Sequence, residues 1–263
     1  MPQIEKHTPG SFCWIELATT DQTAAKSFYA SLFGWVANDM PMGPSDFYTI
    51  FRLEGRDAAA AYTLRPDQRS QGVPPHWMLY IAVEDADAAA PRATELGGTV
   101  VAPPFDVYGA GRMAVLQDPT GAYFCVWQAK ESTGIGIAGV DGSLCWADLS
   151  TPDRARAEDF YSGLFGWHIG KEDEEPGHDY WHIKNAEEFI GGLPAATQRN
   201  PNAPAHWLAY FLVLDCDASA AKAQQLGAAV YLAPMSIEGT GRMAVLADPQ
   251  GAVFAIFQPA PHA

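Results

Sequence analysis

The stretch Gly109–Gln128, GAGRMAVLQDPTGAYFCVWQ, occurs twice in this chain. At Gly239–Gln258 the sequence reads GTGRMAVLADPQGAVFAIFQ, and thirteen of the twenty positions are identical at an offset of 130 residues. In each copy two apolar segments typical of strands flank a DPxG tetrapeptide, whose Pro and Gly suit positions of a tight turn. The stretch therefore predicts a β-hairpin, and its repetition predicts a duplicated fold.

Three further passages repeat at nearly the same spacing. They are FCWIELATTD at Phe12–Asp21 with LCWADLSTPD at Leu144–Asp153, FYASLFGW at Phe28–Trp35 with FYSGLFGW at Phe160–Trp167, and PPHWMLYIAVEDAD at Pro74–Asp87 with PAHWLAYFLVLDCD at Pro204–Asp217. We therefore predict one domain over residues 8–128 and a second over residues 143–259, each of ordinary domain size. Residues 129–142 between them are rich in Gly, Ser and Thr, which is typical of a linker.

Each unit carries two successive strand–helix–strand–strand–strand patterns. The opening strand, SFCWIELAT, is followed by a helix that Thr20 or Asp21 can cap and that Gly34 ends. Short strand patterns follow, and the same series begins again at HWMLYIAVE. Because the second unit repeats this order, the sequence predicts an α+β protein built from four βαβββ modules.

Composition limits the kinds of partner. The chain is 48% hydrophobic and carries a formal net charge of −15, so it can form two ordinary cores but lacks the clustered Lys and Arg that nucleic acid or an anionic membrane surface requires. No apolar run is long enough to span a bilayer, and the first ten residues lack the apolar segment of a signal peptide. The four cysteines form no CxxC pair. These features favour a cytoplasmic protein with buried, reduced thiols.

The repeated passages resemble the vicinal oxygen chelate superfamily, which includes glyoxalase I, bleomycin-resistance proteins and extradiol dioxygenases. The resemblance is carried by the strand followed by D…FY…LFGW, by the strand followed by VEDAD…ELGG, and by the closing hairpin, and it covers nearly the whole chain. It implies tandem vicinal-oxygen-chelate domains, in which the four modules form two eight-stranded curled-sheet cups. It also implies that each cup holds a small-molecule ligand, and in enzymes of the family a divalent metal ion.

The resemblance further implies where metal ligands would stand, and this sequence departs from the family there. The implied positions are Trp14, Met78 and Phe124 in the first copy and Trp146, Leu208 and Phe254 in the second. Indole N–H only donates, Leu and Phe offer no lone pair, and thioether sulfur is a soft ligand. We therefore expect both cups to lack the usual metal site and to have apolar, aromatic walls instead.

Polar residues at a spacing of two from these positions share the same strand face. The first copy thereby offers a candidate catalytic carboxylate, Glu16, and the second offers Asp148. Candidate ligand-binding residues are Trp14, His76, Tyr80, Arg112 and Phe124 in the first copy, and Trp146, His206, Tyr210, Arg242 and Phe254 in the second. Purely structural roles stay open: the histidines bonded to backbone at a strand end, Glu16 ion-paired with Arg112, and the tryptophans in the core.

One difference between the copies keeps a metal alternative open. Thr49 of the first copy aligns with His182 of the second. If one cup holds Zn, Fe, Mn or Ni, the ligands predicted for it are Asp148, His182 and His206.

The sequence thus predicts that the cups bind a small aromatic or carbonyl compound without a metal cofactor. Two enzymatic alternatives stay open. One is a metal-dependent lyase or dioxygenase of the glyoxalase kind, with an altered site in the second domain. The other is a metal-free enzyme in which Glu16 or Asp148 is a general base. A monomer and a homodimer are both compatible with a chain that contains all four modules.

Overall fold

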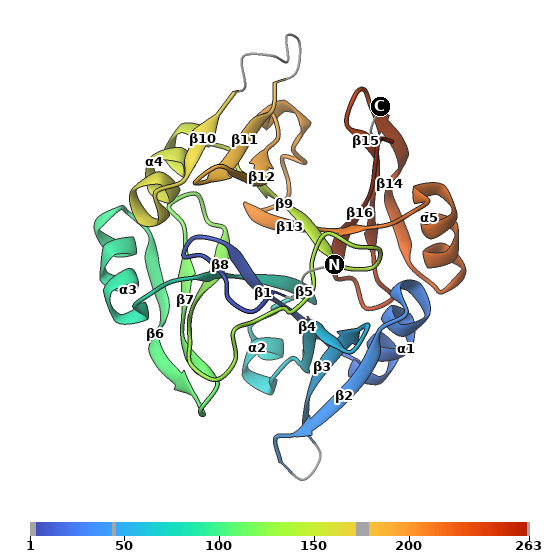
Figure 1. Ribbon diagram of the computed structural model, residues 1–263, viewed down its shortest axis with the longest axis horizontal. Helices are drawn as coiled ribbons and strands as arrows, with labels where there is room; N and C mark the ends of the chain where they lie inside the picture. The colour runs from blue at the N-terminus through green and yellow to red at the C-terminus, as the bar shows by residue number, and fades with distance from the viewer. Residues whose placement is uncertain (1–3, 44–45, 172–178, 262–263) are drawn as a thin grey trace.

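Two eight-stranded sheets make up the protein, one from each half of the chain (Figure 1). The computed structural model describes residues 4–43, 46–171 and 179–261. The first half comprises β1 (Phe12–Thr19), α1 (Gln22–Phe33), β2 (Val36–Pro41), β3 (Phe47–Leu53), β4 (Arg56–Thr63), α2 (Pro66–Ser70), β5 (His76–Ala82), α3 (Ala86–Glu95), β6 (Thr99–Val107), β7 (Gly111–Gln117) and β8 (Tyr123–Ala129). The second comprises β9 (Leu144–Ser150), α4 (Arg154–Phe165), β10 (His168–Gly170), β11 (Trp181–Asn185), β12 (Glu188–Leu193), the short 3-10 helix η1 (Ala196–Gln198), β13 (His206–Leu212), α5 (Cys216–Gln225), β14 (Ala229–Ile237), β15 (Gly241–Ala247) and β16 (Val253–Pro259).

The strand orders confirm the predicted modules. They are β2-β3-β4-β1-β5-β8-β7-β6 and β10-β11-β12-β9-β13-β16-β15-β14, so each sheet joins two βαβββ modules through a central antiparallel pair. Asp21 caps α1 by accepting a hydrogen bond from the Ala24 N–H, and Gly34 ends the helix at φ 74°. Asp153 and Gly166 do the same for α4. We call the concave face of the first sheet cup 1 and that of the second cup 2.

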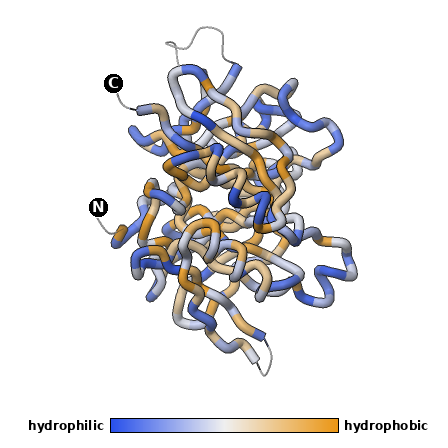
Figure 2. The backbone as a smooth tube through the Cα atoms, turned by 90° about the vertical axis from the view of Figure 1, so that its right-hand side faces the viewer, coloured by the Kyte–Doolittle hydropathy of each residue, from blue (hydrophilic) through white to orange (hydrophobic). Residues whose placement is uncertain are grey.

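The two sheets pack back to back, so the cups face away from each other. α1 lies beside α5 and α3 beside α4, at opposite ends of the interface (Figure 1). Side chains on the convex faces of both sheets form one continuous apolar core. Figure 2 shows hydrophobic segments gathered where the halves meet.

The segment expected to be a linker is built into this core. Ile135, Ile137 and Val140 are buried, and the Ile135 N–H donates to the Cys13 carbonyl. The Gly136 N–H donates to Asp57. At its other end the Gly142 N–H donates to the Leu212 carbonyl, so the connection is bonded to both halves.

Two matching hydrogen-bond chains cross the interface. In one, the Trp207 indole donates to the Tyr161 hydroxyl (2.9 Å), which donates to the carboxylate of Asp118 in the other half (3.0 Å). In the second, Trp77 donates to Tyr29 (3.1 Å), and Tyr29 donates to Asp248 (3.0 Å). All six side chains are buried, and each aspartate also caps its own hairpin turn. We call these the Trp–Tyr–Asp chains.

The thiols and helices add two observations. All four cysteines are free, and Cys13, Cys125 and Cys216 are buried. In the described ranges we find no helix with the length and apolarity needed to cross a membrane.

We predict that Tyr161→Phe lowers the free energy of unfolding by about 1–3 kcal/mol, because it leaves the Trp207 N–H and an Asp118 oxygen buried without a partner. Tyr29→Phe, in the matching chain, should cost a similar amount. Urea unfolding followed by fluorescence and circular dichroism measures both.

The control is Tyr108→Phe, at a residue that is 79% exposed in the turn after β6. It should stay within about 0.5 kcal/mol of the unmodified protein. Equal stabilities for Tyr161→Phe and the control would show that the Trp–Tyr–Asp chains do not stabilise the interface.

Candidate functional site

A half-buried carboxylate, Glu16, lies on the concave face of cup 1 and is held by two tyrosines. Tyr48 donates to Glu16 Oε2 (2.7 Å) and Tyr80 donates to Glu16 Oε1 (3.1 Å). The Trp14 indole N–H donates to the Tyr48 hydroxyl (3.0 Å), which fixes the direction of that phenol. Both carboxylate oxygens of Glu16 are thus engaged by neutral donors.

Cup 2 repeats the arrangement with a shorter carboxylate. Tyr180 donates to Asp148 Oδ1 (2.5 Å) and Tyr210 donates to Oδ2 (2.7 Å). The Trp146 indole N–H reaches both Asp148 Oδ1 (3.1 Å) and the Tyr180 hydroxyl (2.8 Å). We call each set of one carboxylate, two tyrosines and one tryptophan a carboxylate–tyrosine network.

Strand register brings these side chains together. β1 and β5 are antiparallel neighbours in which Trp14 faces Tyr80 and Glu16 faces Met78. Side chains of facing residues lie on the same side of a sheet, so all four belong to the cup. The sequence therefore placed Trp14, Glu16 and Tyr80, and their counterparts Trp146, Asp148 and Tyr210, on one face.

The second tyrosine of each network was not foreseen. Tyr48 and Tyr180 come from β3 and from the residue before β11, and they stand at the same offset of 132 residues as Glu16 and Asp148. A comparison of the two copies at that constant offset would have found them.

Burial changes the acidity of every titratable group in the networks. It raises the pKa of Asp148 to about 6, although the hydrogen bonds from Tyr180, Tyr210 and Trp146 act in the opposite direction. Burial likewise raises the pKa of Glu16, opposed mainly by Tyr48 and Tyr80. The pKa values of the four phenols lie well above their usual value, through burial first and the neighbouring carboxylate second.

The histidines predicted as ligand contacts bond to the backbone. His76 Nδ1 lies 2.8 Å from the Pro74 carbonyl oxygen, and His206 Nδ1 lies 2.9 Å from that of Pro204. Each sits at the first position of its strand, half-buried. The geometry therefore assigns one ring nitrogen of each histidine to fixing the start of the strand.

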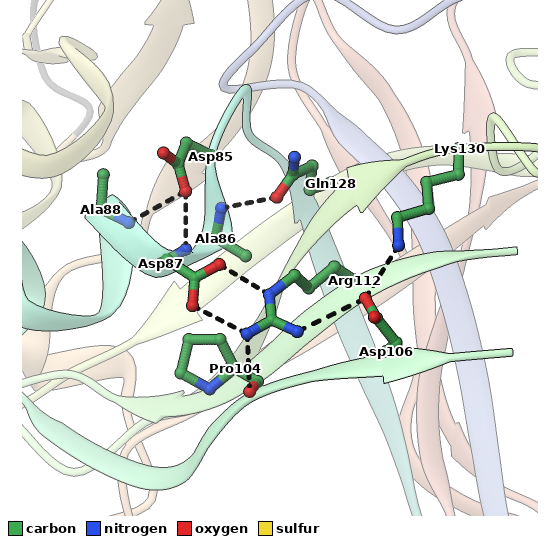
Figure 3. A network of polar contacts seen from close by, with 9 residues as sticks. All are labelled: Asp85, Ala86, Asp87, Ala88, Pro104, Asp106, Arg112, Gln128 and Lys130. Carbon is green, nitrogen blue, oxygen red and sulfur yellow. Dashed lines mark hydrogen bonds and ion pairs between the residues drawn. The ribbon is translucent and has the colours of Figure 1, made fainter. Parts of the chain in front are cut away.

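The prediction that Arg112 and Arg242 line the cups is wrong. Arg112 donates to Asp87 (2.6 and 2.8 Å) and to the Pro104 carbonyl oxygen, and it also pairs with Asp106, as Figure 3 shows. Arg242 binds Asp217 in the same way. Neighbouring Gln128 accepts from the first turn of α3, so this face of β7 and β8 is the convex, helix-covered one. Glu16 consequently has no ion pair with Arg112.

Phe124 and Phe254 were also placed on the wrong face. Phe124 is fully buried on the convex side, where its ring meets those of Phe160, Tyr161 and Phe165 from the other half. Phe254 packs equivalently against α1. The residues that β8 and β16 turn toward the cups are one position later, Cys125 and Ala255, which are the register partners of Tyr80 and Tyr210.

Comparison with known proteins places this fold in a family. Residues 11–126 match the "Glyoxalase/Bleomycin resistance protein/Dioxygenase superfamily", and residues 146–257 match the "Glyoxalase-like domain". The chain is 41% identical to "Putative glyoxylase CFP32" of Mycobacterium tuberculosis (strain CDC 1551 / Oshkosh), with 100% of both chains covered. It belongs to the glyoxalase/bleomycin resistance protein/dioxygenase superfamily.

Other members of this superfamily extend the comparison. The chain is 34% identical to "Anthracycline biosynthesis protein DauV" of Streptomyces sp. (strain C5), covering 97% of this chain and 95% of that one. The fold is similar to the 2,3-dioxygenase LapB from Pseudomonas sp. KL28 (TM-score 0.66, 14% identity, 97% and 94% covered). It is also similar to the Mn(II)-bound glyoxalase from Novosphingobium aromaticivorans (TM-score 0.64, 15% identity, 95% and 82% covered).

The residues of this chain do not fit the metal ion found in some superfamily members. Among the described residues, no group of three or more His, Cys, Asp or Glu side chains is placed to hold one. Both oxygens of Asp148 accept hydrogen bonds from phenols, and His206 Nδ1 bonds to backbone. His182 is the counterpart of Ile50, not of Thr49, because it pairs with Gly170 as Ile50 pairs with Asn38. The set Asp148, His182 and His206 is therefore not assembled.

We predict that Asp148→Asn flattens the pH dependence of stability. Since the pKa of Asp148 is about 6 in the folded protein and that of an ordinary aspartate is 3.8, the native state binds more protons than the unfolded state between these values. The contribution of Asp148 to the free energy of unfolding has its full value below pH 4, falls as the pH rises to about 6, and then stays constant. The fall amounts to roughly 3 kcal/mol. Urea unfolding from pH 4 to pH 7 measures it.

Glu16→Gln should act in the same direction, because burial also raises the pKa of Glu16. The loss of stability with rising pH should be smaller in each variant than in the unmodified protein. If the free energy of unfolding varied with pH in the same way for the unmodified protein and both variants, the assignment of a raised pKa to these carboxyls would be contradicted.

Proposed function

We propose that this protein binds a small aromatic or carbonyl compound in its cups, with the carboxylate–tyrosine network in place of the metal ion of other superfamily members. The observation that carries this proposal is that the network is built twice, at matched positions, with a tyrosine donating to each carboxylate oxygen. A polar ligand group can replace a tyrosine hydroxyl as donor to the carboxylate, or accept from that hydroxyl.

The cup walls suit such a ligand. Around the network of cup 1 lie apolar and aromatic side chains of the second module, among them Met113, Val115, Cys125 and Trp127. Small-molecule sites in proteins combine apolar walls with a few converging polar groups. A planar ligand ring can pack against this apolar wall while an oxygen atom of the ligand forms a hydrogen bond with the carboxylate–tyrosine network.

The names of relatives support the same chemistry. The mycobacterial relative is named a putative glyoxylase and the Streptomyces relative an anthracycline biosynthesis protein, and we take a carbonyl group and an aromatic ring as the features to test. An aromatic ketone combines both features. Acetophenone is therefore the probe that we choose.

We predict that the double variant Tyr48→Phe/Tyr180→Phe binds acetophenone at least tenfold more weakly than the unmodified protein. Loss of one hydrogen bond to a charged or polarised partner costs about 1.5–3 kcal/mol, and 1.4 kcal/mol is a factor of ten. Titration followed by NMR of ¹³C-methyl methionine measures the affinity.

Tyr108→Phe is the matched control, since its ring is exposed outside both cups. It should leave the affinity unchanged, as should exhaustive dialysis against a chelator before titration. Binding that disappears with the chelator and returns with Zn, Fe, Mn or Ni would overturn the metal-free proposal. Equal affinities for the double variant and the control would show that the carboxylate–tyrosine networks take no part in binding acetophenone.

A second function, metal-free proton transfer, is favoured by the raised pKa of Asp148. A pKa of about 6 leaves this carboxylate unprotonated in most molecules at neutral pH, yet more basic than an ordinary aspartate. It can take a proton from the carbon next to a bound carbonyl, while Tyr180 or Tyr210 donates to the developing enolate oxygen. Return of a proton to that carbon restores the carboxylate and completes the cycle.

We predict that the protein catalyses exchange of the acetophenone methyl hydrogens in D₂O, with a rate that rises between pH 5 and pH 7 as Asp148 ionises. Asp148→Asn/Glu16→Gln should reduce exchange to the uncatalysed rate, because an amide is not a base. Proton NMR of the methyl signal gives the rate. An undiminished rate in the double variant would exclude both carboxylates as the base.

A further inference from the structure

We propose that His182 makes cup 2 selective for an aromatic carbonyl compound with a second oxygen that accepts a hydrogen bond, such as a hydroxyl group on the ring. In this arrangement the carbonyl oxygen meets the carboxylate–tyrosine network, and the second oxygen meets the imidazole of His182. This inference rests on the proposed function, because it adds one contact to a ligand that the network of cup 2 already holds.

His182 lies in one row of residues with the carboxylate of cup 2. On the neighbouring strands β10, β11, β12 and β9 (Figure 1), register places four residues side by side, in the order Gly170, His182, Gly192 and Asp148. Residues in such a row point to the same face of a sheet, so the imidazole stands on the concave face together with Asp148. The corresponding residue of cup 1 is Ile50, whose side chain cannot form a hydrogen bond.

The imidazole adjoins the network through Tyr180. A Cβ at Gly192 would overlap the Tyr180 phenol, so that ring fills the position between His182 and Asp148. The phenol and the imidazole pack edge to face with their centroids 5.0 Å apart, and Phe189 packs against the imidazole in the same way at 5.1 Å. These aromatic contacts hold the imidazole beside the phenol that donates to Asp148.

The two nitrogens of the His182 ring differ in their surroundings. Nδ1 is sealed from solvent and has no hydrogen-bond partner within the described part of the chain. Nε2 is not sealed, and it too has no partner among residues 4–43, 46–171 and 179–261. A buried N–H without an acceptor is rarer than a buried acceptor without a donor, so we assign the proton of the neutral ring to Nε2. His182 thereby presents one N–H donor to cup 2.

Gly170 leaves space beside the imidazole. This glycine is the register partner of His182 on the edge strand β10. Within the described ranges, the nearest atom to a Cβ added at Gly170 is Nε2 of His168, at 4.0 Å. Cup 1 has the side chain of Asn38 at this point, next to Ile50. A ligand oxygen can therefore approach His182 on the side of Gly170.

Cup 1 has a different polar group outside its network. The Tyr62 hydroxyl on β4 accepts a hydrogen bond from Gln68 (3.0 Å). Tyr62 corresponds to Pro194 of the second copy, at the offset of 132 residues, and not to His182. Because cup 1 thus offers a hydroxyl of its own at another place, the contribution of His182 has to be measured within cup 2.

The test compares acetophenone with its 3′-hydroxy and 4′-hydroxy derivatives. Met243 of cup 2 matches Met113, which packs with the apolar wall of cup 1, so its ¹³C-methyl signal reports binding in cup 2. We expect at least one hydroxy derivative to bind cup 2 about three- to tenfold more tightly than acetophenone, which is the gain from one neutral hydrogen bond. The ¹⁵N signal of His182 Nε2 should shift with that derivative and not with acetophenone.

His182→Phe is the decisive variant, because a phenyl ring can keep the contacts with Tyr180 and Phe189 but has no N–H. The ratio of the two affinities in cup 2 should return to about one. Gly170→Asn, which copies the residue of cup 1, should lower the same ratio while the imidazole stays in place. This second variant serves if His182→Phe does not fold, and the Met113 signal of cup 1, titrated with acetophenone, shows whether each variant is folded.

Three outcomes would overturn the inference and leave the proposed function standing, because acetophenone still shifts Met243 in each of them. Neither hydroxy derivative binds cup 2 more tightly than acetophenone. The gain is present but persists in His182→Phe, so that another group makes the contact. The gain is present but the Nε2 signal stays in place, so that His182 does not touch the ligand. If no compound shifts Met243, the proposed function fails for cup 2 and this inference fails with it.

Discussion

The hydrogen bond from each helix tyrosine to the aspartate of the other half's hairpin turn is the constraint on which the rest of the structure depends. Tyr161 and Tyr29 are buried, and each carries a tryptophan donor on one side and an aspartate acceptor on the other. An unpaired polar group at such depth is costly, so the two halves can bury their aromatic faces only in the register that satisfies both Trp–Tyr–Asp chains. That register sets the sheets back to back and turns both cups outward.

This explains which residues the duplicated sequence repeats. The tyrosine of FY, the tryptophan of HW and the aspartate of DPxG are the three members of the chains. The tryptophan of LFGW also crosses the interface: Trp35 donates to the Gly142 carbonyl and Trp167 to that of Gly10. Several of the residues that the two copies share therefore maintain the interface. The cups, which carry the proposed chemistry, differ at several matched positions.

Sequence reasoning predicted the fold and the β1 and β5 parts of the site, because alternation along a strand fixes the face of every side chain once one is known. It misplaced Phe124, a position implied by the family resemblance, because a shift of one residue moves a side chain to the opposite face of the sheet. Arg112 was misplaced because its partner, Asp87, lies on a helix whose position over the sheet is a tertiary feature. Tyr48 was missed because β3 reaches Glu16 only through β4, which lies between them in the sheet.

A carboxylate buried among neutral donors is unfavourable, and Asp148 is held in this way. Three neutral donors around Asp148 reduce the cost without removing it, as the raised pKa of that group shows. A metal ion would neutralise the charge, but the phenols occupy the oxygens that it would bind. A ligand carbonyl group that accepts from a phenol or from the protonated carboxyl, or a ligand hydroxyl that donates to the carboxylate, makes use of the groups as they stand. The cost of burial is then the reason that the networks favour a polar ligand group.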